Sequence, residues 1–265
     1  MQVDTLPAMA SLEVASSSLE KDTANSSLQL PDTTITNKVY LDIGIAPTAL
    51  KPSGQRLLGS KSAIPIEDAL PAGRIVIGIY GNQVPVTAGN FLELVRSGSL
   101  QGTVFSRVIP GEYIQAGQQG QLKMGGLQAP SGIKPNREIS SSRAFALNHS
   151  RPGTVSLSLS ENDEDPKIQN MPGYTRLEFL ITTGPGPVPR LDGQNIPFGK
   201  VLEGMGVISA ITKVPTFRAN ERTSSLNLLA GKLGDDRAAG VRRKYGRPFK
   251  AVIILAAGEL PVLAT

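Results

Sequence analysis

Apolar residues alternate with a period of two in one short segment of the chain. Ile75, Ile77 and Ile79 fall on one face of an extended strand, and Val76 and Tyr80 fall on the other. A strand that carries large apolar residues on both faces is covered on both sides. The pattern therefore predicts part of the wall of a barrel or a sandwich.

The spacing of apolar residues becomes helical between Thr87 and Gly98, where the glycine is a plausible stop. A second, shorter helical stripe consists of Met205, Ile208 and Ile211. The longer stripe consists of Ala88, Phe91, Leu92 and Val95. A closed antiparallel barrel has no free edge to protect, and two amphipathic helices can plug its open ends. We therefore expect a mainly β fold, a closed antiparallel barrel capped by two helices.

The chain has 265 residues, of which 40% are apolar, and this suffices for one domain with a full core. Residues 1–37 are rich in Ser, Thr, Ala and Asn and lack a sustained period. They predict a flexible leader, the alternative being a short helix formed on a partner. Residues 38–262 form the predicted domain, with long insertions at residues 47–71, 122–152 and 213–250, the second of which predicts an irregular surface loop.

The chain has no cysteine and one histidine, His149. Disulfides, thiolate chemistry and multi-histidine metal sites are therefore excluded, and we expect no metal and no cofactor. A serine nucleophile would need His149 as its base, and no Gly-x-Ser-x-Gly motif accompanies it, so hydrolase chemistry is unsupported. The loop sequence around His149 predicts a surface position for its side chain.

The basic character of the protein is local. Ten Lys and Arg against three Asp and Glu give residues 213–250 a balance of +7, above the +5 of the whole chain. Such a segment is either a solvated face or a binding surface for an acidic protein, a membrane or nucleic acid. Only three aromatic residues are interleaved with these charges, which argues against nucleic acid. The densest basic cluster is Arg242, Arg243 and Lys244.

Two other segments argue against a calcium site and against a transmembrane segment. The acidic run Glu161-Asn-Asp-Glu-Asp165 lacks the alternating ligands and the glycine of a calcium loop, so we expect a solvated turn. The longest apolar run, residues 251–257, is too short to span a bilayer, so the sequence predicts no transmembrane segment.

Residues 105–117 are the most informative segment, with the sequence Phe-Ser-Arg-Val-Ile-Pro-Gly-Glu-Tyr-Ile-Gln-Ala-Gly. Arg107 lies on an apolar strand, Gln115 follows eight residues later, and Ile-Pro-Gly forms a rigid turn between them. Two planar hydrogen-bonding groups at the edge of an apolar surface can hold an amide while part of it is desolvated. The alternative is that both side chains only tie the sheet to a loop.

This segment resembles the signature of the cyclophilins, the peptidyl-prolyl cis-trans isomerases, whose usual form is Phe-His-Arg-Ile-Ile-Pro-Gly-Phe-Met-x-Gln-Gly-Gly-Asp. Further blocks are similar to the family in the same order, over roughly residues 38–260. They include the Val-Pro-Val-Thr-Ala-Gly-Asn-Phe of residues 84–91 and the Leu-Asp-Gly-Gln-Asn-Ile-Pro-Phe-Gly-Lys-Val of residues 191–201. The resemblance implies an eight-stranded barrel with two helices.

The resemblance also implies a mechanism. Rotation about a prolyl bond is resisted by about 20 kcal/mol because the C–N bond is partly double. In the family an arginine draws the nitrogen lone pair out of conjugation, and Arg107 matches this arginine. Gln115 matches the glutamine that orients the arginine and the substrate carbonyl. Six further residues match substrate-binding positions: Phe105, Tyr113, Leu159, Leu180, Leu191 and Asn195.

Several positions depart from the family pattern. Tyr113 replaces a methionine, and Leu180 replaces the phenylalanine at the base of the proline pocket. Glu112 replaces a phenylalanine, and its carboxylate would compete for the guanidinium of Arg107. Arg190 replaces the tryptophan that many members need for tight cyclosporin binding. Further replacements are Leu159 for asparagine, Glu178 for glutamine and Asn195 for histidine.

The resemblance therefore implies an isomerase-family protein that assists protein folding by binding proline-containing segments of clients. The departures imply a degenerate proline pocket and weak activity. The alternative is a catalytically inactive binding or assembly module for a protein complex. The layout, with a long leader and long loops, resembles the divergent plant cyclophilins of the chloroplast, several of which lie in the thylakoid lumen.

Overall fold

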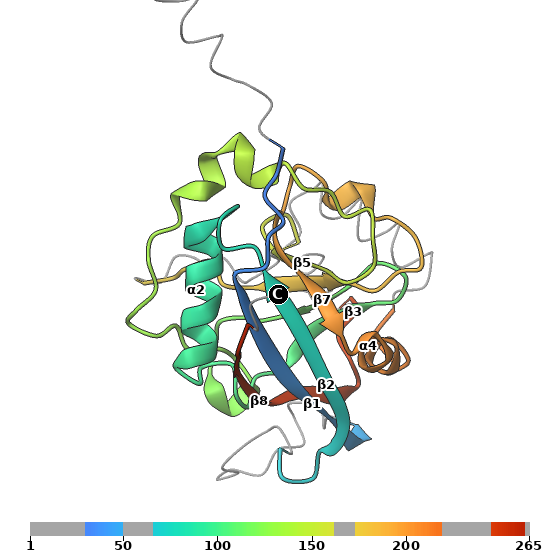
Figure 1. Cartoon of the computed structure of the whole chain (residues 1–265). Coiled ribbons are helices and arrows are strands. Elements are labelled where there is room, and N and C mark those ends of the chain that lie inside the picture. Colours follow the sequence, from blue (N-terminus) through green and yellow to red (C-terminus); the bar gives the residue numbers. More distant parts are fainter. Residues whose placement is uncertain (1–29, 50–65, 162–172, 219–244, 263–265) are drawn as a thin grey trace, which may run out of the picture. The chain divides into compact units, whose positions relative to one another are not determined.

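The computed structural model describes residues 30–49, 66–161, 173–218 and 245–262, and the compact unit that carries the fold begins at Asp32. Its eight strands form one antiparallel sheet with the order β3-β4-β6-β5-β7-β2-β1-β8. The strands are β1 (Asn37–Ala49), β2 (Leu70–Ile79), β3 (Phe105–Ile109), β4 (Tyr113–Ala116), β5 (Thr154–Leu157), β6 (Phe179–Thr182), β7 (Ile196–Glu203) and β8 (Lys250–Leu260). The sheet curls into a barrel wall, with β1 and β2 in front and β8 passing behind them (Figure 1).

The two ends of this sheet approach each other, so the barrel is nearly closed. Val104, which precedes β3, forms an isolated antiparallel bridge with Ile253 of β8. The amide of Gly102 donates to the carbonyl of Ile254 at 2.8 Å, and the amide of Val108 donates to the carbonyl of Gly246 at 2.7 Å. The predicted mainly β barrel is therefore confirmed.

Strand β2 has the predicted alternation and is covered on both faces. Ile75, Ile77 and Ile79 lie in the main core, which lines the inside of the barrel. Val76 and Tyr80 on the opposite side are also buried. The sheet is thus covered on its outer face here, as its apolar sequence predicts.

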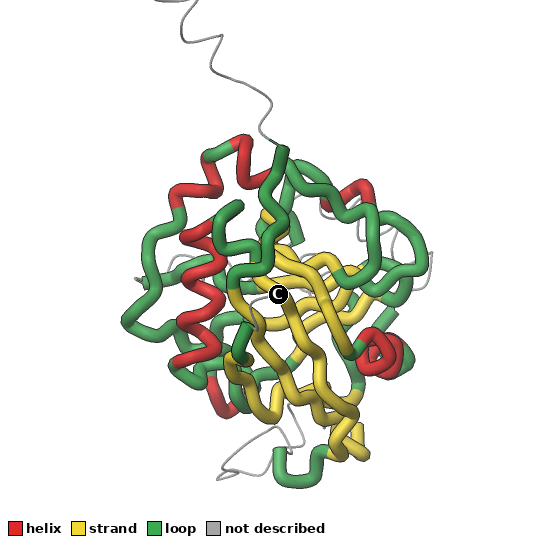
Figure 2. The backbone as a smooth tube through the Cα atoms, viewed as in Figure 1, coloured by secondary structure: helices red, strands yellow, loops and turns green. Residues whose placement is uncertain are grey.

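Two helices accompany the barrel, α2 (Pro85–Arg96) and α4 (Met205–Thr212). The tube in Figure 2 shows them on opposite sides of the strands. The predicted stripe of α2 is buried, and Gly98 follows the helix with a φ of +71°, a left-handed conformation that suits glycine. In α4, Ile208 and Ile211 are buried, but Met205 is 36% exposed. The prediction that Met205 belongs to the buried stripe is therefore wrong, because it is the first residue of the helix and lies at the edge of the contact.

Helix α2 receives its N-terminal cap from a distant segment. Val84 precedes the helix and provides no side-chain cap. Instead, the carboxylate of Glu138 accepts hydrogen bonds from the amides of Val86 and Thr87, each at 2.8 Å, and from the Thr87 hydroxyl at 2.7 Å. A carboxylate at this end satisfies unpaired amides and interacts favourably with the helix dipole.

Glu138 belongs to the segment 122–152, which is irregular as predicted but does not lie only on the surface. It contains the short helices η2 (Leu122–Met124), η3 (Arg137–Ser140) and η4 (Ser142–Phe145). Leu127, Ala144 and His149 within it are buried. The segment therefore contributes to the core, and the expectation of a surface loop is wrong for these side chains.

Residues 32–36, which precede β1, are attached to the barrel. The amide of Asp32 donates to Gln83 Oε1 at 2.8 Å, and the amide of Thr36 donates to the Ile79 carbonyl at 2.9 Å. Residues 1–29 of the predicted leader, 50–65 of the first insertion and 219–244 of the basic segment lie outside the described residues. Among the helices that are described, none has the length and apolar character needed to cross a membrane.

The cap on α2 yields a prediction about stability. Glu138→Ala removes the acceptor of three hydrogen bonds and leaves helix amides unpaired. We expect the free energy of unfolding to fall by about 1–2 kcal/mol, as for other lost caps. Urea unfolding followed by circular dichroism measures the change. Glu67→Ala, at an exposed position, is the control, and an equal effect of both substitutions would reject the capping role.

Candidate active site

Strand pairing places the two predicted catalytic side chains in one row across the sheet. Arg107 on β3 is directly opposite Gln115 on β4, and Gln115 is opposite Leu180 on β6. Leu180 is opposite Ser156 on β5, which completes the row. Gly111, with a φ of +86°, forms the turn between β3 and β4 after Pro110, as in a type II turn. Tight turn geometry therefore fixes the register that aligns Arg107 with Gln115.

Arg107 is half-buried and directed toward the start of the loop that follows β5. Its Nη1 donates to the carbonyl of Glu161 at 3.3 Å and lies 3.5 Å from the hydroxyl of Tyr113. The guanidinium is thus held above the sheet by contacts with a loop and with the neighbouring strand. This leaves an always-charged, planar group at the surface of the barrel.

Gln115 is 2% exposed, and its amide has a defined orientation. Its Nε2 hydrogen-bonds to the carboxylate of Glu178, and contacts Ser158 Oγ at 3.3 Å and the Glu161 carbonyl at 3.4 Å. The Oε1 atom has no hydrogen-bond partner among the described residues. A nitrogen directed at a carboxylate is a donor, so the unused group of Gln115 is an acceptor.

The apolar residues of the predicted proline pocket pack against one another. Tyr113, Leu180 and Leu191 are at most 1% exposed, and together with Val188 they form a separate cluster. Ile109 at the end of β3 packs against this cluster. We call Tyr113, Leu180, Val188 and Leu191 the floor of the site. In this conformation the floor is covered.

Arg190 covers the floor. It lies on the short helix η5 (Pro189–Leu191), and its guanidinium carbon is 5.4 Å from the centroid of the Tyr113 ring. Its Nε donates to Glu112 Oε2 at 2.8 Å, and its Nη1 donates to Glu161 Oε1 at 2.8 Å. The carboxylate of Glu112 therefore binds Arg190. We expected Glu112 to compete for the guanidinium of Arg107, and the structure pairs it with Arg190 instead.

Tyr113 connects the floor to Glu161, which also binds Arg190. Its hydroxyl donates to Glu161 Oε2 at 2.9 Å. Burial raises the pKa of Tyr113 to about 12, so the hydroxyl keeps its proton at neutral pH. Glu161 itself has a side chain that is only 15% exposed. The prediction of a solvated turn is therefore wrong for Glu161, and residues 162–165 lie outside the described part of the chain.

The remaining predicted site residues, Asn195, Leu159 and Phe105, do not all lie at the site. Asn195 is fully buried, and its Oδ1 accepts from the amides of Leu159 and Ser160 at 2.8 and 3.2 Å. Asn195 and Leu159 thus hold the start of the loop that presents Glu161. Phe105 lies in the main core, because a register irregularity between Phe105 and Arg107 turns the two side chains to different faces. The structure does not bring Phe105 to the site.

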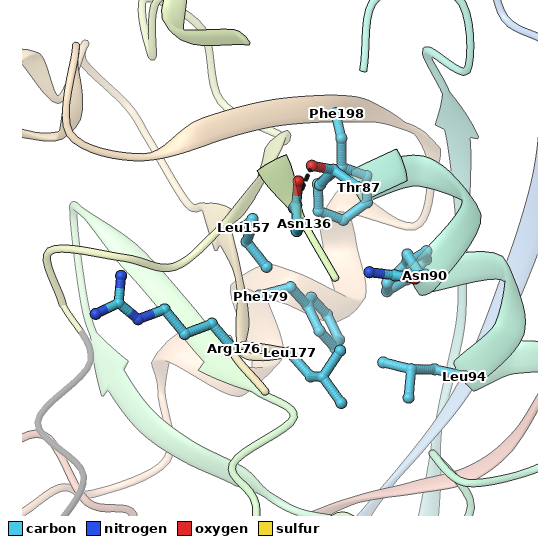
Figure 3. Close-up of a pocket in the computed structure, with 10 residues that line it drawn as sticks. Thr87, Asn90, Leu94, Asn136, Leu157, Arg176, Leu177, Phe179 and Phe198 are labelled. Carbon is cyan, nitrogen blue, oxygen red and sulfur yellow. Dashed lines mark hydrogen bonds between the residues drawn. The ribbon is translucent and has the colours of Figure 1, made fainter. Parts of the chain in front are cut away.

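A small hollow lies on the other face of the sheet. Its volume is about 270 Å³ including the solvent at its mouth. Figure 3 shows Leu94, Phe179 and Phe198 around it, with Asn90 and Asn136 at its polar side. Phe179 precedes Leu180 on β6, so their side chains point to opposite faces. The hollow is therefore separate from the row that contains Arg107 and Gln115.

Comparison with known proteins identifies the family of this chain. The family model described as "Cyclophilin type peptidyl-prolyl cis-trans isomerase/CLD" matches residues 64–230. The chain belongs to the cyclophilin family. It is 42% identical over 237 residues to the peptidyl-prolyl cis-trans isomerase CYP28, chloroplastic, of Arabidopsis thaliana, covering 88% of this chain and 84% of that protein.

More distant relatives are also named as peptidyl-prolyl cis-trans isomerases. Identity is 29% over 214 residues to the peptidyl-prolyl cis-trans isomerase CYP26-2, chloroplastic, of Arabidopsis thaliana, covering 72% of this chain and 66% of that protein. It is 30% over 233 residues to the peptidyl-prolyl cis-trans isomerase D of Saccharomyces cerevisiae, covering 86% of this chain and 75% of that protein. The resemblance inferred from the motifs is confirmed.

The single histidine of this cyclophilin is buried against strand β5. His149 Nδ1 is 2.8 Å from Asp192 Oδ1, and Nε2 is 2.8 Å from Ser156 Oγ. The arrangement has the order of a Ser-His-Asp triad, but His149 and Ser156 are both 0% exposed, so no substrate can reach the hydroxyl. The prediction that His149 lies at the surface is wrong, because its ring nitrogens pair with Asp192, which is 43 residues away, and with Ser156 on β5.

Sequence reasoning missed some residues that contact the predicted site. Ser158 and Glu161 contact Gln115 only because the chain after β5 folds back over the sheet. The available signal in the sequence was the acidic residue Glu161, which directly follows the predicted strand 154–160. Among the described residues no group of three or more His, Cys, Asp or Glu side chains could hold a metal ion.

His149 yields a prediction about pH. Burial lowers the pKa of His149, and the hydrogen bond and charge of Asp192 only partly oppose this. Below the ordinary value of 6.5, the unfolded chain takes up a proton that the folded chain does not. The contribution to stability is therefore complete above that pH and is lost as the pH falls through the lowered folded value.

We expect this loss to add at most about 1.4 kcal/mol per pH unit to the acid slope of the free energy of unfolding. Urea titrations between neutral and mildly acidic pH measure that slope. His149→Gln should flatten it, whatever its effect on absolute stability. Identical slopes for both proteins would show that His149 is not the responsible group.

Proposed function

We propose that this cyclophilin is a slow peptidyl-prolyl cis-trans isomerase that assists folding by binding proline-containing segments of other proteins. The proposed site is the row of Arg107, Gln115 and Leu180 together with Tyr113 and Leu191. Two observations support it. The row joins a charged planar donor, an amide and an apolar floor on one face of the sheet, and family membership supplies the reaction.

In the proposed mechanism Arg107 approaches the prolyl nitrogen and draws its lone pair out of conjugation with the carbonyl. This weakens the partial double bond without forming a covalent intermediate. The guanidinium is suited to the role because it stays charged at any physiological pH. Its contacts with Glu161 and Tyr113 hold it near the surface, so the charge is positioned before the substrate arrives.

The covered floor is the observation that carries the proposal of slow turnover. A proline ring gains affinity by burying apolar surface, and Tyr113, Leu180 and Leu191 are already buried against each other beneath Arg190. Loss of one such apolar contact is worth about 1.5–3 kcal/mol, or roughly a ten- to hundredfold change in binding. We therefore propose a degenerate proline pocket.

The orientation of Gln115 supports the same proposal. A substrate carbonyl needs a donor, and Nε2 of Gln115 is already directed at Glu178, Ser158 and the Glu161 carbonyl. The atom left over is the acceptor Oε1, which is buried. In this conformation Gln115 therefore offers no donor to a substrate carbonyl, which lowers the expected rate.

The second candidate function is a binding or assembly module without turnover. The same covered floor favours it, and the +7 balance of residues 213–250 suits an acidic protein surface. We propose the chloroplast as the compartment, because two of the relatives are named chloroplastic. The thylakoid lumen within it is proposed from the resemblance to divergent plant cyclophilins alone. Nucleic acid and membrane partners are not part of this proposal.

Arg107 separates the two candidates. Arg107→Ala removes the charge at the prolyl nitrogen, so we expect isomerase activity on Xaa-Pro peptides to fall at least tenfold while the fold survives, because the side chain is half-buried and outside the core. Exchange spectroscopy by NMR measures the cis-trans rate without a coupling protease. Arg74→Ala, which removes a surface ion pair with Asp42, is the control.

Full activity in Arg107→Ala would reject the assignment of the site. Absence of activity in the wild-type protein, with intact binding of the same peptides, would favour the binding module.

Arg190 leads to a prediction about an inhibitor. In the family, cyclosporin is held through a tryptophan, and the resemblance aligns Arg190 with that position, its guanidinium lying between Glu112 and Glu161. We expect cyclosporin to bind at least a hundredfold more weakly than to a cyclophilin with the tryptophan, since an aromatic contact is replaced by a group that is costly to desolvate. Titration calorimetry measures this, and tight binding would show that Arg190 does not occupy the inhibitor position.

A further inference from the structure

The edge of the proposed site carries more negative than positive charge. One guanidinium, that of Arg190, lies between two carboxylates, those of Glu112 and Glu161. The side chains of Arg190 and Glu112 are 47% and 39% exposed, so both face solvent beside the floor. The three groups together have a formal charge of −1.

Two further charged groups among the described residues lie at the site, and they do not change this balance. Arg107 is half-buried next to Tyr113 and hydrogen-bonded to the Glu161 carbonyl, and Glu178 is buried beside Gln115. Their formal charges are opposite, so the total over all five groups remains −1. Because Arg107 and Glu178 are less exposed, the groups that a bound peptide meets first are Glu112 and Arg190.

Glu112 also keeps an unused acceptor. The Nε and Nη2 groups of Arg190 both bind Glu112 Oε2, whereas Glu112 Oε1 makes no hydrogen bond to any described residue. A cation can therefore bind Oε1 while Arg190 stays in place. An anion would have to share a guanidinium that already binds two carboxylates and would lie beside both.

We infer that Glu112 makes the site select clients in which a lysine or arginine is adjacent to the proline. This inference rests on the proposed function, since it assumes that the proline binds at the row of Arg107 and Gln115. A client cation pairs with Glu112 Oε1 while the proline approaches the floor beneath Arg190. A client with an aspartate, a glutamate or a phosphoserine at that position is disfavoured by the net negative charge.

The test compares peptides that differ only beside the proline. Ala-Lys-Pro-Phe and Ala-Glu-Pro-Phe place the charge before it, and Ala-Ala-Pro-Lys and Ala-Ala-Pro-Glu place it after. Binding is measured by titration of the labelled protein in NMR, and isomerisation of the same peptides is measured by exchange spectroscopy. We expect roughly fivefold tighter binding of the lysine peptide in at least one series, and a smaller ratio in 0.5 M salt.

Two substitutions test the residue itself in opposite directions. Glu112→Gln keeps the shape of the side chain and removes its negative charge. The ratio of the affinity for the lysine peptide to the affinity for the glutamate peptide should therefore approach one. Arg190→Gln removes the positive charge between the carboxylates, so the ratio should rise. Asp42→Asn, which neutralises a carboxylate of a surface ion pair on β1, is the matched control and should leave the ratio unchanged.

The outcomes separate this inference from the proposed function. Preferential binding of lysine peptides without measurable turnover would reject the isomerase activity and support the charge selection. Turnover of all peptides at equal affinity would support the isomerase and overturn the selection by Glu112. A preference for the glutamate peptides, an unchanged ratio in Glu112→Gln, or no binding of any peptide would each overturn it as well.

Discussion

The pairing of β3 with β4 and of β4 with β6 is the constraint on which the rest of the site depends. It places Arg107 opposite Gln115 and Gln115 opposite Leu180, so one row across the sheet contains the cation, the amide and the apolar floor. Side chains on a strand alternate between faces, so a shift of one residue would turn the whole row into the core. The turn at Gly111 prevents such a shift by fixing the hairpin.

Buried polar contacts hold the elements around this row. Asn195 fixes the two amides at the start of the loop after β5, and His149 joins Asp192 to Ser156 of β5. Glu138 caps α2 from a segment fifty residues away in the chain. Each of these groups would be costly to leave unpaired, so they act together to specify one arrangement of loops on the barrel.

The site itself combines a cyclophilin framework with an unusual cover. The pocket residues pack into a closed floor, and an ion-paired arginine lies over the aromatic ring of Tyr113. Such exposed ion pairs contribute little to stability, because solvent screens them and long side chains lose freedom. In the proposed site their effect on recognition would be larger, since they would decide which charges can approach a bound proline.

The sequence alone determined the architecture. The alternation around Ile77, the helical stripe before Gly98 and the motif blocks sufficed for a barrel, two helices and the family, because these signals lie within short stretches of chain. It also placed Arg107 and Gln115 on adjoining strands of one hairpin. These features depend on local periodicity and turn chemistry, which neighbouring residues fully specify.

The tertiary structure decided which side chains meet. The sequence placed His149 at the surface and Glu161 in solvent, and paired Glu112 with Arg107. In the fold, His149 is buried, Glu161 contacts the site and Glu112 binds Arg190. The difference arises because contacts between residues distant in the chain depend on how loops return to the sheet, and an irregularity of one residue in β3 suffices to send Phe105 into the core. No local pattern in the sequence encodes the return of the loops or the irregularity in β3.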